Sequence, residues 1–442
     1  MRTEPLRAVR EALERLAGKG AKILLAVSGG SDSMGLMRLS SAVAPDLDLA
    51  LSVGFVDHGL RPGVDEEWAL VEAAAGRLGL EARRERVQGA PCGGSVQAWA
   101  RDARYALLTR MACERGAGFV ATGHTLDDQA ETMLLRLLRG TGLDGLCGIP
   151  ERRDAGGVAI VRPLLALRRE RVRDHLRGLG QPWVEDPSNR NPRFARSRVR
   201  AELLPLMSSL QPEVAVRLAG LAREARGLTE AVDRRLLSEC SLDPLRLGGG
   251  LKVDCEVIAA LPRGLRGRLV RLAVQRARGD LRRVERVHLA AMESASGTRR
   301  STGLLPLPGP SVALVDRGSL YVFPGPLPPR TEQEARLESA GDAVWRARSV
   351  ELGAAVEVRP GADGLVLRAR RPGDRLWGSS RKLKNLFIER EVPRPYRDFV
   401  PLLASGADVL AAPGLLPCRR PDLVVLWTLD STAPARDLGI CF

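Results

Sequence analysis

Apolar residues along the first 160 positions follow two alternating patterns: a short β-type run, and then a longer segment with helical spacing. In chain order these segments are 22–27, 31–43, 49–56, 64–78, 81–87, 95–115, 119–122 and 126–139. Strand–helix alternation predicts a parallel sheet with helices on both faces. Because ligands of such sheets bind beyond the carboxyl ends of the strands, we look for chemistry after the runs that end near 27, 56 and 122.

The remainder of the chain changes character at three points. A polar linker is expected at 186–200, and apolar residues with helical spacing return from 201 to about 294. Glycine and proline are frequent between 297 and 330, with short β-type pieces at 311–315 and 319–323. We predict four parts: an α/β domain at 1–200, a helical domain at 201–295, a short β segment or linker at 296–335, and a small α+β domain at 336–442.

Charge narrows the choice of partners. The 442 residues are 44% apolar, enough for sizeable cores, and 68 Lys and Arg against 53 Asp and Glu give a net charge of +15. Nearly all of the positive charge is guanidinium, which holds phosphate well, because the only lysines are Lys19, Lys22, Lys252, Lys382 and Lys384. A polyanion is the first partner to consider, although genome composition also produces an arginine bias.

The cysteines and the N-terminus indicate the compartment. The seven cysteines include no CxxC pair, and no set of His and Cys has zinc-ligand spacing. The N-terminus lacks the pattern of a signal peptide, and no apolar run approaches the roughly 18 residues of a membrane helix. We therefore expect a cytoplasmic protein with reduced thiols and no membrane partner.

The segment after the first strand has the character of a phosphate-binding loop. Paired glycines let backbone N–H groups approach an oxyanion, the helix start adds its positive dipole end, and a carboxylate is available for Mg²⁺. An ordinary strand–helix turn with a capping Ser or Asp is the alternative. The residues of this loop are Ser28, Gly29, Gly30, Ser31, Asp32 and Ser33.

This loop resembles the SGGxDS loop of the N-type, or PP-loop, ATP pyrophosphatases, which split ATP between its α and β phosphates. The resemblance implies a Rossmann-like, adenine nucleotide α hydrolase-like fold for the N-terminal domain. It implies that Asp32 binds Mg²⁺ and that the pyrophosphate end of ATP is held by Ser28, Gly29, Gly30, Ser31 and Ser33.

Further segments resemble one family of PP-loop enzymes, the tRNA(Ile)-lysidine synthetases. The strongest is GHTLDDQAET at 123–132, and the others include VDHGLR at 56–61, ARDARY at 100–105, RPL at 162–164, EDPSN at 185–189, RPGDR at 371–375 and KLKNLF at 382–387. The family joins free L-lysine to the 2-position of the wobble cytidine of a CAU-anticodon tRNA(Ile), which changes its specificity from AUG to AUA. The resemblance thus implies an ATP-dependent ligase that adenylates the cytosine and then forms a C–N bond with release of AMP.

Acidic residues at the start of the helix at 126–139 suit this chemistry. The i, i+3 and i+4 spacings place Asp127 and Asp128 near Glu131. Paired carboxylates hold an ammonium group, and one with a raised pKa takes its proton. The resemblance maps the lysine site onto Asp128 and Glu131 and leaves open which is the general base. The alternative is a helix cap by Thr125 or Asp127 with a solvated acidic turn.

Basic residues are expected around the leaving phosphate. Arg196 lies where the family has such a residue, but the family pattern usually has Asn in place of the next serine, so the role stays open between Arg196 and Arg200. Arg101 and Arg104 are further phosphate or tRNA candidates, with an ordinary helix surface as the alternative. His124 is expected near the adenylate or the target base. The predicted catalytic set is Asp32, Asp128, Glu131 and Arg196.

The later domains are expected to bind the tRNA. In the final domain, a phosphate-binding face is predicted from Arg371, Arg375, Lys382 and Lys384. Because the family often forms dimers, a homodimer is a candidate assembly. Two alternatives remain: another PP-loop tRNA-modifying enzyme such as a thiolase, which generally needs a cysteine pair or an iron–sulfur cluster, and a tRNA-binding protein without catalysis.

Overall fold

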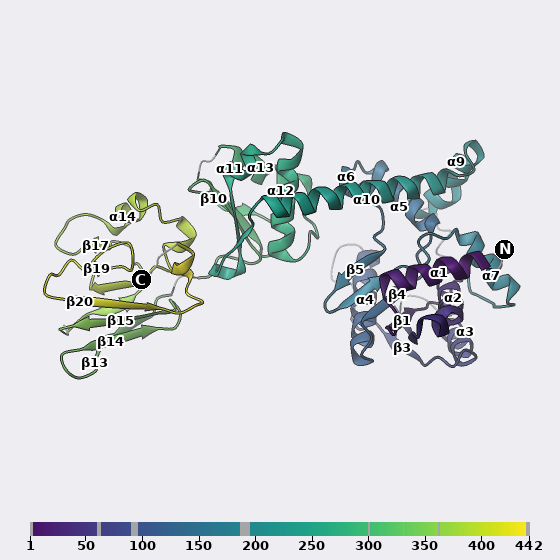
Figure 1. The fold of residues 1–442 in the computed structure, drawn as a ribbon, viewed down its shortest axis with the longest axis horizontal. Helices are drawn as coiled ribbons and strands as arrows, with labels where there is room; N and C mark the ends of the chain where they lie inside the picture. The colour runs from purple at the N-terminus through teal and green to yellow at the C-terminus, as the bar shows by residue number, and fades with distance from the viewer. Residues whose placement is uncertain are drawn as a thin grey trace. The chain divides into compact units, whose positions relative to one another are not determined.

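The computed structural model of the chain describes residues 3–59, 63–89, 96–185, 195–298, 301–329, 331–360 and 363–438. These residues belong to two units, Met1–Ala231 and Val232–Phe442, and each is described by itself (Figure 1). The predicted division into four parts is finer than this and stays a prediction.

A six-stranded sheet in the order β3-β2-β1-β4-β6-β5 forms the centre of the first unit. Its strands are β1 (Lys22–Ala26), β2 (Ala50–Asp57), β3 (Ala82–Arg86), β4 (Phe119–Thr122), β5 (Arg152–Ala155) and β6 (Val158–Val161). All neighbours pair in parallel except β5 and β6. The predicted parallel α/β fold is therefore confirmed, and β5 adds an antiparallel edge strand that the sequence analysis did not foresee.

Helices cover both faces of this sheet. Ile23 and Leu25 pack with α1, α2, α3 and α7 on one face, whereas Leu24 between them packs with α4 on the other. The predicted helices correspond to α2, α3, α4 and α5. The helices of this unit are α1 (Thr3–Leu16), α2 (Ser31–Leu47), α3 (Val64–Gly76), α4 (Val96–Glu114), α5 (Leu126–Leu138), α6 (Leu143–Leu146), α7 (Arg169–Gly178), α8 (Ala195–Arg198), the π-helical turn η2 (Val199–Leu203), α9 (Leu204–Leu210) and α10 (Val214–Glu239), which continues into the second unit.

The expected polar linker at 186–200 is helical at its C-terminal end. Residues from 195 onward form α8 and η2, and Val199 is buried against α5. The DPSN motif at 186–189 lies outside the described residues, as does the end of the motif at 56–61.

The first half of the second unit combines helices with one antiparallel sheet. The sheet has the order β7-β8-β11-β10-β9, so strands at 243–254, inside the stretch expected to be helical, join one sheet with the two predicted β-type pieces. The strand at 251–254 pairs with the piece at 319–323, which in turn pairs with the other piece. Its strands are β7 (Asp243–Pro244), β8 (Leu251–Asp254), β9 (Leu305–Pro306), β10 (Val312–Asp316) and β11 (Ser319–Phe323), and its helices are α11 (Cys255–Ala260), α12 (Arg263–Arg278) and α13 (Arg286–Thr298).

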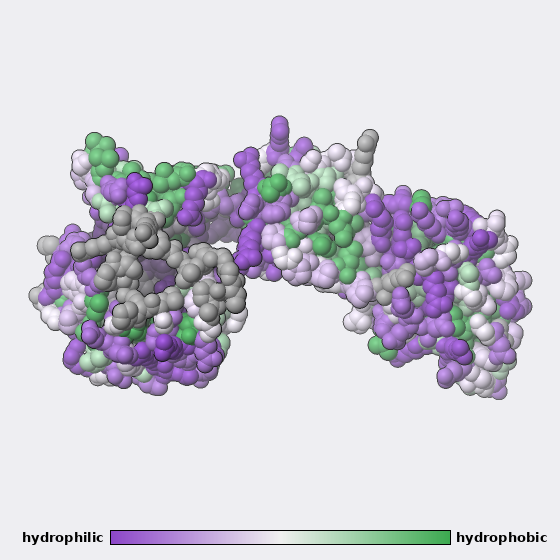
Figure 2. All heavy atoms as spheres, turned by 180° about the vertical axis from the view of Figure 1, so that it is seen from behind, coloured by the Kyte–Doolittle hydropathy of each residue, from purple (hydrophilic) through white to green (hydrophobic). Residues whose placement is uncertain are grey.

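Two further sheets, ordered β12-β16-β18-β19-β17 and β13-β14-β15-β20, form the C-terminal part. Val358, Leu367 and Leu403 belong to a core shared by the two sheets. Hydrophilic side chains cover most of this part on the face seen in Figure 2. The elements are β12 (Glu334–Arg336), β13 (Glu338–Ser339), β14 (Trp345–Ser349), β15 (Ala354–Arg359), β16 (Val366–Arg368), β17 (Arg375–Leu376), α14 (Leu383–Glu389), β18 (Leu402–Ser405), β19 (Asp408–Ala411) and β20 (Val424–Leu429).

No helix among the described residues is both long enough and apolar enough to cross a membrane.

Candidate active site

The loop between β1 and α2 is held by its own serines. The Ser33 hydroxyl donates to the Gly30 carbonyl at 3.0 Å, and the Ser28 backbone N–H donates to Ser33 Oγ at 3.1 Å. Gly29 has a φ of 82°, in the left-handed region that glycine favours. The described residues provide no side-chain cap for α2, so the N–H groups of its first turn remain available to an anion.

The loop after β4 lies directly against this phosphate loop. A Cβ added at Gly123 would lie only 2.7 Å from the Asp32 carbonyl oxygen, so the two loops meet backbone to backbone. The next residue, His124, shares a hydrogen bond between Nδ1 and Thr122 Oγ1 at 2.9 Å. The first turns of α2 and α5 are therefore neighbours, as the positions of the strand ends predicted.

Asp128 caps helix α5 with one carboxylate oxygen and contacts the basic residues of the candidate site with the other. Its Oδ2 accepts hydrogen bonds from the Thr125 backbone N–H and the Thr125 hydroxyl, both at 2.9 Å, which makes a capping box at the start of α5. Its other oxygen, Oδ1, faces the basic residues described next. The capping alternative and the predicted lysine site thus involve different oxygens of one carboxylate.

Arg169 joins the acidic residues into one cluster. From the start of α7 its Nε donates to Asp32 Oδ2 at 2.9 Å, its Nη2 to Asp128 Oδ1 at 3.0 Å, and its Nη1 to Glu131 Oε1 at 3.2 Å. Its backbone N–H also donates to Asp127 Oδ2 at 2.7 Å. The predicted metal carboxylate and the predicted lysine carboxylates therefore share a single guanidinium.

Arg196 and Arg200 complete the cluster, and both contact the carboxylates predicted to bind lysine. Arg196 donates to Asp128 Oδ1 at 2.8 Å and to Glu131 Oε2 at 2.9 Å. Arg200 donates to both oxygens of Glu131, at 2.6 and 3.0 Å, and more weakly to Asp128. Glu131 is fully buried and accepts four hydrogen bonds from three arginines, about as many as a carboxylate can take.

Charges in the cluster shift the titration of its members. Burial would raise the pKa of Asp128, but the charges of Arg169 and Arg196 outweigh it and hold the pKa at about 2. For Asp32 burial prevails over Arg169, and its pKa lies above the ordinary value. Burial also lowers the pKa of His124 to about 3, so this imidazole is neutral at physiological pH.

Asp32 has an oxygen suited to Mg²⁺. Its Oδ1 accepts only a long bond of 3.4 Å from the Ser31 hydroxyl among the described residues, while Oδ2 is engaged by Arg169. No group of three or more acidic, His or Cys side chains that could hold a metal ion occurs in the described part of the chain. A cation here would thus be held by one carboxylate and substrate phosphates, an arrangement typical of Mg²⁺.

Comparison with known proteins agrees with this geometry. Residues 3–207 match the family model of a PP-loop domain, and residues 365–423 match that of a TilS substrate C-terminal domain. A tRNA(Ile)-lysidine synthase of Symbiobacterium thermophilum is 32% identical, with 93% of this chain and 94% of that protein covered. This chain belongs to the tRNA(Ile)-lysidine synthases. A synthase of Geobacter sulfurreducens is 34% identical over 91% of this chain and 89% of its own length.

Membership of the lysidine synthases makes this chain an enzyme of a PP-loop family that uses ATP and acts on tRNA.

Sequence reasoning missed Arg169 and also Arg173, whose Nε donates to Ser31 Oγ at 3.3 Å. Both lie on one helix with polar residues at most positions, a pattern typical of a solvent-exposed helix. No local signal identified them, because their place at the site depends on β6, a strand that the sequence analysis did not predict.

The basic residues predicted in the C-terminal part of this lysidine synthase are exposed. Arg375 and Lys382 pair across a β-bridge, and Lys384 follows on α14, none of them with an acidic partner among the described residues. Arg371 instead donates to Glu334 at 2.9 Å. The β-bridge brings Arg375 and Lys382 together, and a phosphate-binding face that includes all four residues stays a prediction, as does its contact with tRNA.

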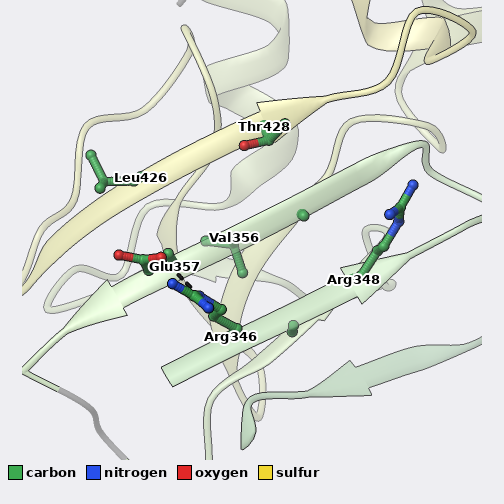
Figure 3. Close-up of a pocket in the computed structure, with 8 residues that line it drawn as sticks. Arg346, Arg348, Val356, Glu357, Leu426 and Thr428 are labelled. Atoms are coloured by element: carbon green, nitrogen blue, oxygen red, sulfur yellow. Dashed lines mark hydrogen bonds and ion pairs between the residues drawn. The ribbon is translucent and has the colours of Figure 1, made fainter. Parts of the chain in front are cut away.

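A separate hollow lies over strands β14, β15 and β20. Its rim carries Arg346 and Arg348, and Arg346 pairs with Glu357 at 2.9 Å across neighbouring strands (Figure 3). Sequence reasoning did not single out these arginines, because alternation of charged and apolar residues is ordinary for a half-exposed strand.

Proposed function

We propose that this chain ligates free L-lysine to C2 of the wobble cytidine of CAU-anticodon tRNA(Ile), converting ATP to AMP and pyrophosphate. The observation that carries the proposal is the cluster around Arg169, in which the carboxylate beside the phosphate loop and the two carboxylates of α5 share one guanidinium. Two half-reactions, on a phosphate and on an amine, need sites that adjoin in this way.

In the first step the cytosine O2 attacks the α-phosphorus of ATP and pyrophosphate leaves. Serines and backbone N–H groups of residues 28–33 bind the departing phosphates, and Asp32 would hold Mg²⁺, which offsets the phosphate charge. His124, neutral and hydrogen bonded to Thr122, orients the base by a hydrogen bond and does not supply a positive charge.

In the second step the ε-amine of lysine attacks C2 and AMP leaves. Asp128 and Glu131 bind and orient the amine, and the proton lost from nitrogen passes to one of them or to water. Arg196 and Arg200 turn from these carboxylates to the phosphate of AMP, where a guanidinium stabilises the leaving group. Both arginines serve in this proposal, which removes the need to choose between them.

The proposal has further parts that rest on the sequence patterns and on the resemblance. They are a cytoplasmic location, a homodimer, the four-part division of the chain, and tRNA contacts through Arg371, Arg375, Lys382 and Lys384. Light scattering tests the dimer, and substitution of the basic residues tests the contacts.

The decisive experiment combines purified protein, ATP, Mg²⁺, L-lysine and unmodified CAU tRNA(Ile), with mass analysis of the wobble nucleoside after digestion. Lysidine formation with one AMP per event is the expected result. Asp32→Asn is the matched inactive variant, expected to bind tRNA but not to release pyrophosphate. ATP turnover without a lysine adduct would instead indicate another PP-loop modification, and no turnover would indicate a binding protein.

A further inference from the structure

Four arginines converge on one tyrosine at the edge of the candidate active site. The guanidinium carbons of Arg101, Arg104 and Arg153 lie 5.8, 5.3 and 5.1 Å from the centre of the Tyr105 ring. Arg162, the residue after β6, lies close enough for its charge to act on the Tyr105 hydroxyl. We call Arg101, Arg104, Arg153 and Arg162 around Tyr105 the arginine cage.

The positive charge of the arginine cage is not balanced within the described part of the chain. None of its four arginines has an acidic partner there, whereas many other arginines of this unit do, Arg84 with Asp57 among them. Arg162 is only 3% exposed, donates to the Pro150 carbonyl at 2.6 Å, and leaves its Nε without a partner. The buried Tyr105 hydroxyl lies beside the Arg162 guanidinium.

An anion would relieve this arrangement. Like charges gathered around one side chain are unfavourable, most of all at the buried Arg162, and its unpaired Nε costs further free energy. The tyrosine ring offsets part of the repulsion, since guanidinium groups are attracted to an aromatic face. Burial raises the pKa of Tyr105, but Arg104, Arg162 and Arg101 outweigh it, so the pKa lies below its ordinary value.

The arginine cage adjoins the reacting groups through His124. The charges of Arg162 and Arg104 act on this imidazole, and so does the charge of Asp128. His124 follows β4, and β4 pairs with β6, which Arg162 follows, so this imidazole lies near both the arginine cage and the acidic cluster of α5. A ligand in the cage would therefore be close to the RNA base that binds next to His124 in the proposed function.

The arginine cage lies apart from the phosphate loop at 28–33. That loop follows β1, whereas Arg162 follows β6, two strands along the sheet in the order β1-β4-β6. Two strand spacings amount to about 10 Å. In the proposed function the phosphate loop serves the nucleotide, so the cage is left for a phosphate of the other substrate.

We infer that the arginine cage binds a backbone phosphodiester of the RNA next to the nucleotide that enters the active site. This inference rests on the proposed function and adds Arg153, Arg162 and Tyr105 to it. Flipping a nucleotide out of its stack costs a few kcal/mol, which contacts to the adjacent phosphate would offset. Arg162 and Tyr105 are the fixed, buried base of the cage, and Arg101 and Arg153 are its exposed arms.

The test compares Arg153→Gln and Arg101→Gln with Arg152→Gln. Arg152 is the adjacent residue of β5, loses the same charge, and lies over the Phe119 ring with a bond to the Leu16 carbonyl, away from Tyr105. We measure tRNA dissociation constants between 50 and 300 mM salt, roughly the range over which counterion release is read. The slope of the logarithm of the dissociation constant against the logarithm of the salt concentration should fall by about one in each cage variant. It should stay unchanged in Arg152→Gln.

Dissociation constants for the non-hydrolysable analogue AMPCPP separate the two sources of phosphate. They should be equal in all three variants and the unchanged protein. A weaker AMPCPP affinity with an unchanged tRNA salt slope would mean that the cage holds nucleotide phosphates and would overturn the inference. Equal slopes in cage and control variants would overturn it as well.

Folding and the proposed function are checked separately. The cage arginines lack acidic partners, so removing one should leave the melting temperature unchanged or raise it. A double variant, Arg101→Gln with Arg153→Gln, should lower the slope by about two. Lysidine formation by the unchanged protein is measured in the same preparation; if it fails while the slopes change as expected, the proposed ligase activity is wrong and the RNA site stands.

Discussion

Arg169 Nε donates to Asp32 Oδ2 at 2.9 Å, which joins the first turn of α7 to the first turn of α2. The two residues are 137 positions apart in the chain, and their bond crosses from the nucleotide side of the candidate site to the amine side. Arg169 is 14% exposed, so water screens this contact little. The acidic cluster is thus held together by a residue outside the predicted catalytic set.

Replacing Arg169 by Gln should destabilise the first unit by about 3 kcal/mol, because three buried or half-buried carboxylates lose a shared partner. Urea unfolding measures this. Arg177→Gln on the same helix removes an exposed guanidinium paired with Glu170 and Asp174, and should cost less than about 1 kcal/mol. Equal effects of the two substitutions would mean that the cluster contributes no stability.

Lysine should bind more tightly when a nucleotide is present. Arginines saturate Glu131 in the structure, so an ammonium group gains access only when they leave, and a nucleotide phosphate attracts them away. We expect at least a tenfold gain in lysine affinity with AMPCPP, which corresponds to about 1.4 kcal/mol. Isothermal titration calorimetry measures both affinities.

The matched variants for this coupling are Arg200→Gln and Arg198→Gln. Arg198 lies between the two cluster arginines but pairs with Glu202 at the surface, so its removal should leave the coupling unchanged. Arg200→Gln should bind lysine more tightly without nucleotide and show less coupling. Identical lysine affinity with and without AMPCPP in the unchanged protein would contradict the prediction.

Stability should fall in mild acid because of His124. Its pKa is about 3 in the folded protein and about 6.5 when unfolded, so between these values only the unfolded state takes up the proton. Lowering the pH from 6.5 therefore costs up to about 1.4 kcal/mol per unit, and this loss ends below about pH 3. The free energy of unfolding of His124→Asn should depend less on pH than that of the unchanged protein, since the other histidines contribute equally to both.

Asp374 of the RPGDR motif should be a structural residue. It forms two 2.9 Å hydrogen bonds with Arg368, and both side chains are almost fully buried. Asp374→Asn leaves a buried guanidinium poorly compensated and should cost about 3 to 5 kcal/mol in urea unfolding. Asp398→Asn, which breaks a partly exposed pair with Arg370, should cost less than about 1 kcal/mol. A small effect at Asp374 would count against this role.

The sequence predicted the elements whose signals are local. The apolar run at 119–122 predicts a strand and the helical spacing at 126–139 predicts a helix. The structure has β4 and α5 at these places. The hairpin of β5 and β6 was missed because only β6 is a β-type run, while β5 has the sequence RRDA, although Gly156 and Gly157 between them, both with positive φ, are a recognised hairpin signal. Its strands have four residues each, too few to stand out by periodicity.

The acidic members of the site followed from spacing, but their partners did not. Asp128 and Glu131 are one helical turn apart, so their proximity is a local property. Arg169 contacts them only because β6 returns the chain to the same edge of the sheet, and no pattern around 169 contains that information. The division of Asp128 between a helix cap and the cluster likewise needed the position of each oxygen.

The absence of a side chain at Gly123 has a consequence for engineering. Since this residue and Asp32 meet through their main chains, no substitution of side chains elsewhere can bring the nucleotide loop and α5 closer, and any residue larger than glycine forces them apart. The distance between the phosphate loop, which serves the first half-reaction, and the start of α5, which serves the second, is then fixed by the backbone. Attempts to make the protein accept a longer or shorter amine should therefore vary the side chains between the phosphate loop and α5, and should keep Gly123.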